Sequence, residues 1–107
     1  MFDNKIFLSF NTAKKVVESY LNQHLNNFVI NEAENYGMSF SIIFSYNNKI
    51  VSLLSDRGDL TYKLIINNIE INLVGFEPLL VNIEWFSEKN ILFVLNTIKR
   101  YLETLSN

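Results

Sequence analysis

The sequence predicts an α+β fold: an antiparallel meander sheet of four to five strands, flanked by an N-terminal and a C-terminal helix packed on one of its faces. Apolar residues recur every three or four positions near both ends of the chain, as on the buried stripe of a helix. They recur every second position over the middle of the chain, as in half-buried strands. Asn47-Asn48 and Asn67-Asn68 separate such segments and are typical of tight hairpin turns.

The first helix is predicted from an apolar stripe that lies opposite charged and polar residues. Asn11 or Thr12 is expected to cap its start, and Asn26-Asn27 to end it, because asparagine favours caps and turns over helix interiors. The preceding residues, 1–10, are apolar without a clear period and fit either a short helix or a docked arm. The stripe consists of Ala13, Val16, Val17, Tyr20, Leu21, Leu25 and Phe28.

Residues 28–34 and 38–46 are predicted to be the first two strands, and residues 49–54 the third. The turn at Asn47-Asn48 fixes the register of the second hairpin, so that Phe44 opposes Val51, Ile42 opposes Leu53 and Phe40 opposes Ser55. The reverse face then mixes serines with apolar side chains and is neither core-like nor fully polar. Its residues are Ser41, Ser45, Ser52, Ile43, Ile50 and Leu54.

Residues 55–59 are dense in turn formers and charges and are predicted to link the third strand to the fourth. Gly58 supplies a positive φ and Asp56 suits an Asx turn, which leaves Arg57 without a local role. Residues 60–66 and 69–74 are expected to form a further hairpin, followed by an edge strand or irregular segment through Trp85. One face of this hairpin is predicted to carry Tyr62, Leu64, Ile66, Ile69, Ile71 and Leu73, and the other Lys63, Glu70 and Asn72.

The last helix is expected to start at Ser87 or Asn90, and Lys99-Arg100 lie near its C-terminal end, where the helix dipole favours cations. Its predicted buried stripe is Ile91, Val94, Leu95, Ile98, Leu102 and Leu105.

The composition suits a single domain spanning residues 1–107: 49% of the residues are hydrophobic and 19% are charged. A net charge of −2 is too small to attract nucleic acid through the overall field. The chain has no cysteine, shows no signal-peptide pattern, and has no apolar run longer than residues 91–95, far short of the roughly 20 residues that a bilayer requires. We therefore expect a cytoplasmic protein with no membrane or nucleic-acid partner.

The residues offer little support for catalysis. His24 is the only histidine and falls within the first helical stripe, where a histidine at the edge of the core is the expected role. Glu32 and Glu34 alternate on one strand face, but two carboxylates are too few for a cation site. The three glycines stand apart, without the pattern of a phosphate-binding loop. We predict no metal, no cofactor and no enzymatic activity.

One segment resembles a known family. The strand Ile50-Val51-Ser52-Leu53-Leu54 followed by Ser55-Asp56-Arg57-Gly58, a further strand and a C-terminal helix is similar to small bacterial immunity proteins encoded beside polymorphic or contact-dependent growth inhibition toxins. The resemblance implies stoichiometric binding of a cognate toxin domain, often a nuclease, whose active site is occluded. It also implies acidic side chains meeting a basic toxin surface.

The leading hypothesis is therefore an immunity or antitoxin-like protein that neutralises a toxin by binding it. The predicted partner-binding residues are Asp56, Arg57, Asp59, Glu32, Glu34 and Glu70. The alternative is a structural or accessory protein that self-associates, for example as a homodimer, through the reverse face at Ser41, Ile43, Ile50 and Leu54. A small enzyme that uses His24 with a carboxylate is a third hypothesis.

Overall fold

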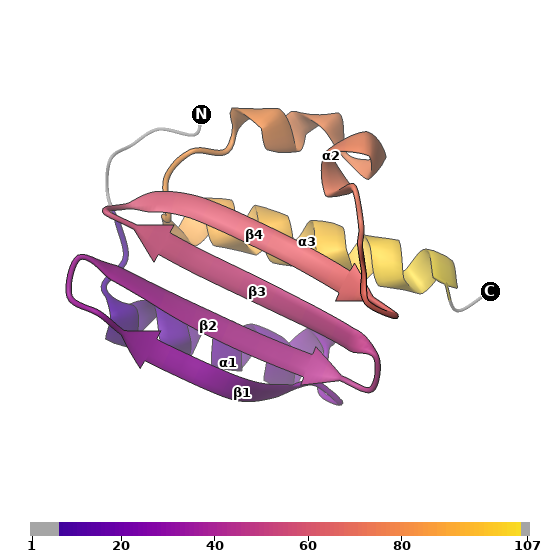
Figure 1. Cartoon of the computed structure of the whole chain (residues 1–107), viewed down its shortest axis with the longest axis horizontal. Helices are drawn as coiled ribbons and strands as arrows, with labels where there is room; N and C mark the ends of the chain where they lie inside the picture. The colour runs from indigo at the N-terminus through magenta and orange to yellow at the C-terminus, as the bar shows by residue number, and fades with distance from the viewer. Residues whose placement is uncertain (1–6, 106–107) are drawn as a thin grey trace.

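The computed structural model describes residues 7–105, which form an antiparallel sheet and its flanking helices (Figure 1). The predicted α+β class is confirmed, with five strands in the order β1-β2-β3-β4-β5. In chain order the elements are α1 (Phe10–His24), β1 (Val29–Asn35), β2 (Ser39–Tyr46), β3 (Lys49–Asp56), β4 (Asp59–Ile66), β5 (Ile69–Glu70), α2 (Leu73–Phe76), the 3-10 helix η1 (Pro78–Asn82) and α3 (Glu88–Leu105).

Helices α1 and α3 lie behind the same face of the sheet, and α2 and η1 lie beside β4 (Figure 1). The core fills the space between the two layers. Phe44 and Leu53 from the sheet, Val17 from α1 and Leu95 from α3 are all fully buried there. The alternating pattern of β2 and β3 thus serves one buried face, as predicted from the period of two.

Helix α1 begins earlier than predicted. The Ser9 side chain, and not that of Asn11 or Thr12, caps the helix by accepting a hydrogen bond from the Thr12 backbone N–H at 3.3 Å. Leu8 donates its backbone N–H to the Phe86 carbonyl at 3.0 Å, which holds the chain before α1 against the segment that leads into α3. Residues 7–9 are thus a docked arm, one of the two predicted alternatives, and residues 1–6 of that segment lie outside the described residues.

The register of β2 and β3 is confirmed at all three predicted pairs, including Phe44 opposite Val51. The predicted link over residues 55–59 is wrong, because Ser55 and Asp56 complete β3 and Asp59 begins β4. Only Arg57 and Gly58 form the turn, with φ values of 52° and 91°. Two successive positive φ values give a turn whose twist matches that of the paired strands, so both strands run up to it.

The predicted strand over residues 69–74 is also too long, since β5 ends at Glu70. The Asn72 side chain accepts a hydrogen bond from the Gly75 backbone N–H at 3.0 Å and caps the short helix α2. This local bond competes with the ladder and turns the chain away from the sheet. As a result Leu73 is buried, whereas Ile69, expected on the same buried face, is 66% exposed.

Helix α3 starts after Ser87, one of the two predicted positions, whose Oγ accepts from the Asn90 backbone N–H at 3.2 Å. Its stripe is buried as predicted except at Leu105, which is 48% exposed. The C-terminal end of α3, where Leu105 lies, extends past the end of the sheet (Figure 1).

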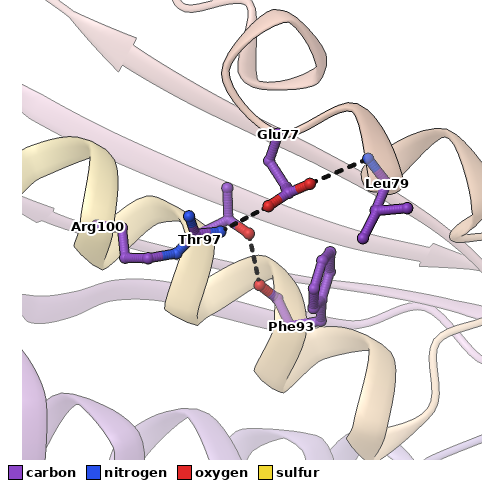
Figure 2. Close-up of polar contacts among 5 residues, drawn as sticks. All are labelled: Glu77, Leu79, Phe93, Thr97 and Arg100. Carbon is purple, nitrogen blue, oxygen red and sulfur yellow. Dashed lines mark hydrogen bonds and ion pairs between the residues drawn. The ribbon is translucent and has the colours of Figure 1, made fainter.

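Figure 2 shows how α3 holds the segment of α2 and η1. Arg100 donates to one oxygen of Glu77 at 2.9 Å, and the other oxygen accepts the Leu79 backbone N–H at 3.1 Å. The backbone bond and the Arg100 guanidinium together lower the pKa of Glu77 below its ordinary value. Within α3 itself, Thr97 is fully buried and donates its hydroxyl to the Phe93 carbonyl at 2.8 Å.

Candidate functional site

The sheet has a second face that no described helix covers (Figure 1). Its residues follow from the register, because side chains alternate between the two faces and Phe40, Ile42 and Phe44 point into the core. We call this surface the open face. It consists of Val29, Glu32, Glu34, Ser39, Ser41, Ile43, Ser45, Ile50, Ser52, Leu54, Asp56, Asp59, Thr61, Lys63, Ile65 and Glu70.

The open face has an apolar and serine-rich centre. Ile43 and Ile50 on neighbouring strands are joined there by Leu54 on β3 and Ile65 on β4. Ile50 is 37% exposed and the other three are half-buried. Ile43, Ile50 and Leu54 were predicted on this face from the sequence, whereas Ile65 and Val29 were not. The alternation along β4 could have predicted Ile65, because it lies between Leu64 and Ile66, which were assigned to the other face.

All five predicted carboxylates lie on the open face, at its periphery. Glu32 and Glu34 belong to β1, at one edge of the sheet. Asp56 and Asp59 are paired at the turn between β3 and β4. Glu70 lies on the short strand β5, at the other edge of the sheet, and pairs with Ile65 of β4. They are therefore not one compact cluster but an acidic rim around an apolar centre.

The two glutamates of β1 interact electrostatically. Both are exposed, and the Tyr36 hydroxyl donates a hydrogen bond to Glu34 at 2.5 Å. The hydrogen bond between the two carboxyl groups raises the pKa of Glu32 and lowers that of Glu34, and the Tyr36 hydroxyl lowers the pKa of Glu34 further. Glu34 is thus the member of the pair that keeps its negative charge to lower pH.

Arg57 stands in the turn between the two aspartates. Its guanidinium lies 3.8 Å from the Asp56 carboxylate, and the two side chains are 71% and 58% exposed. An ion pair this exposed adds little stability, so little is lost when it breaks. The guanidinium is therefore accessible to a partner. The Arg57 backbone N–H donates to the Met38 carbonyl at 2.8 Å, which fixes this turn against the neighbouring turn of β1 and β2.

His24 lies elsewhere and is not the core-edge residue that the stripe predicted. It is the last residue of α1 and is exposed, with its ring 4.6 Å from that of Tyr20, which takes the buried position one turn earlier. Both residues line a groove of about 520 Å³ between α1 and α3, together with Lys15, Glu88 and Asn96. This groove is on the helix layer, away from the open face.

Within residues 7–105, no group of three or more histidine, cysteine, aspartate or glutamate side chains could hold a metal ion. In the same range, no helix combines the length and apolar character needed to cross a membrane. Comparison with known protein families, with curated proteins and with solved structures finds no match for this chain.

Proposed function

We propose that this chain is an immunity or antitoxin-like protein that binds a cognate bacterial toxin domain through the open face and neutralises it by occluding its active site. The observation that carries the proposal is the acidic rim around an apolar centre. Buried apolar side chains at the centre of a contact, with a polar rim around them, are the usual arrangement of a protein interface.

The distribution of charge supports a basic partner more strongly than the net charge of −2 does. The open face carries five carboxylates and a single lysine, Lys63. The helix layer instead carries most of the cations, which are Lys14 and Lys15 on α1 and Lys89, Lys99 and Arg100 on α3. A partner with a basic surface is therefore attracted to the open face, and nucleic-acid-cleaving toxins have such surfaces because their substrates are polyanions.

The first experiment is affinity capture with the neighbouring reading frames co-expressed. The proposal requires one stoichiometric partner that is toxic when expressed alone and harmless when this chain is present. Recovery of the tagged chain alone, with no toxic neighbour, contradicts it.

Charge reversal then tests the surface. Glu32→Lys with Glu34→Lys should slow association with the captured toxin by about tenfold or more, because peripheral charges act mainly on the association rate. This decrease in the association rate should become larger as the salt concentration falls. The matched control, Glu18→Lys with Glu88→Lys, makes the same charge change on the helix layer and should leave the rate nearly unchanged. Single alanine substitutions at Asp56, Arg57, Asp59 and Glu70 extend the test, and unchanged binding in every variant would show that the proposed site is wrong.

The second candidate function is self-association through the open face, favoured by its apolar centre, where Ile50 is exposed and Ile43 and Leu54 are half-buried. Light scattering separates the two. A stable oligomer that Ile50→Lys converts to a monomer supports self-association. A monomeric unsubstituted chain contradicts self-association and leaves the proposed toxin inhibitor.

A further inference from the structure

The two edges of the sheet are built differently. The outer side of β4 is occupied at both of its ends. At one end β5 pairs with Ile65 and Ile66, and the Ile71 backbone N–H donates to the Leu64 carbonyl at 2.8 Å. At the other end of the strand, Leu60 donates to the Glu84 carbonyl at 2.8 Å, and Trp85 forms a bridge with Asp59. Strand β1 is the opposite edge, and no described strand pairs with its outer side.

The free edge of β1 presents backbone hydrogen-bonding groups at known positions. Tyr36 donates its backbone N–H to the Ser39 carbonyl at 2.8 Å, so the backbone polar groups of Tyr36 point towards β2. Successive residues of a strand direct their backbone N–H and C=O groups to opposite sides. The backbone groups of Glu32 and Glu34 therefore also point towards β2, while those of Ala33 and Asn35 point outward. These groups are a template for one more strand.

Charge decides which strand fits. The side chains of Glu32 and Glu34 lie on the open face, two residues apart, next to where an added strand would run. A second copy of this chain paired symmetrically about Ala33 would place Glu32 of one copy opposite Glu34 of the other. Like charges directly opposite one another destabilise a strand pair, whereas lysine or arginine at alternate positions stabilises it.

We propose that the outer edge of β1 receives an extended segment of the partner as an added strand, with basic side chains at alternate positions facing Glu32 and Glu34. The inference rests on the proposed function for the identity of the partner, but not for the docking edge. The opposing view is that the two glutamates and the bulge at Asn31 serve only to keep other strands away, as charges and bulges often do at sheet edges.

A peptide titration followed by amide NMR distinguishes these views without the toxin. The probe is a nine-residue peptide that alternates threonine and lysine, and the control probe alternates threonine and glutamate. The proposal predicts shifts of the Ala33 and Asn35 amides, and slower hydrogen exchange there, with the basic peptide only. Shifts confined to other strands or to the helices, or no shifts with the basic peptide at millimolar concentration, would overturn it.

Two pairs of variants locate the contact. Ala33→Pro removes the outward N–H and should abolish the shifts, whereas Ala33→Val keeps the N–H with similar bulk and should retain them. An edge strand tolerates proline where its N–H faces outward, and circular dichroism checks the fold. Glu32→Gln with Glu34→Gln should weaken peptide binding about tenfold, and Glu18→Gln with Glu88→Gln should not. The glutamine pair tests the proposal even if the proline variant fails to fold.

The outcomes separate the two proposals. If a toxin is captured and binds Ala33→Pro as tightly as Ala33→Val, docking at the β1 edge is wrong and the proposed function stands. If the basic peptide binds at β1 but no neighbouring protein is neutralised, the edge site stands and the proposed function is wrong.

Discussion

The contact between Gly58 and Phe7 gives a prediction whose size follows from the structure. Gly58 has a φ of 91°, and a Cβ added there would lie 2.6–2.8 Å from three atoms of the Phe7 ring. Gly37 has nearly the same φ, 95°, but an added Cβ would meet nothing within 4 Å. Substitution by alanine therefore causes backbone strain at both positions, and a steric clash only at Gly58.

The strain of a left-handed conformation costs an alanine about 1–2 kcal/mol. At Gly58 the methyl group must also displace the Phe7 ring, whose centroid lies 5.5 Å from that of Trp85. Loss of such an aromatic pair costs about 1 kcal/mol more. We therefore expect Gly37→Ala to lower the free energy of unfolding by about 1–2 kcal/mol, and Gly58→Ala by about 2–3 kcal/mol.

A double-mutant cycle measured by chemical denaturation isolates the clash. In a Phe7→Ala background the ring is gone, so Gly58→Ala should cost no more than Gly37→Ala, and the coupling between the two sites should be about 1 kcal/mol. Equal costs of Gly58→Ala in both backgrounds would contradict the predicted clash, because the Phe7 ring would then not contact the turn.

Three further predictions concern the core and the polar contacts. Glu77→Gln should reduce the decrease in the free energy of unfolding at acid pH. The pKa of Glu77 is lowered in the folded state, so its carboxylate stabilises the fold above the ordinary pKa of 4.5. This contribution is lost as the pH falls through the folded-state pKa. Burial, with a smaller effect of the nearby Glu103, raises the pKa of Tyr20 to about 12, so stability should fall as the pH rises from 10 towards 12, and Tyr20→Phe should reduce that fall. The same variant loses the 2.7 Å hydrogen bond to Asn96 and about 1 kcal/mol at neutral pH. Leu53→Ala should cost about 2–5 kcal/mol, because this side chain is fully buried in the core.

Denaturation across the pH range checks the two titrations, with the unsubstituted chain as reference. An acid limb unchanged in Glu77→Gln would show that its bonds to Leu79 and Arg100 do not persist in solution. An alkaline limb unchanged in Tyr20→Phe would contradict the raised pKa. For the core, Leu79→Ala is the control, since that side chain is 55% exposed and should cost little; equal losses at both leucines would place Leu53 outside the core.

The class of the fold, the register of β2 against β3 and the two faces of these strands were predictable from the sequence. These depend on neighbouring residues: the period of two assigns each side chain to a face, and Asn47-Asn48 sets the pairing between the strands. The same local signals misjudged the turn at Arg57-Gly58 and the length of β5. The charged segment over residues 55–59 is typical of a loop, and only the pairing of β3 with β4 shows that its ends belong to strands. The alternation beyond Glu70 likewise does not predict that Asn72 caps a helix.

The assembly of the candidate site depends on tertiary contacts that no local sequence pattern predicts. These contacts bring carboxylates of β1, of the adjoining ends of β3 and β4, and of β5 onto one face, while most of the lysines lie on the helix layer. Tertiary contacts also place Glu84 and Trp85 against one end of the outer side of β4, whereas no described strand pairs with the outer side of β1. Each of these features joins residues far apart in the chain, and such contacts depend on which layers pack together rather than on any local pattern.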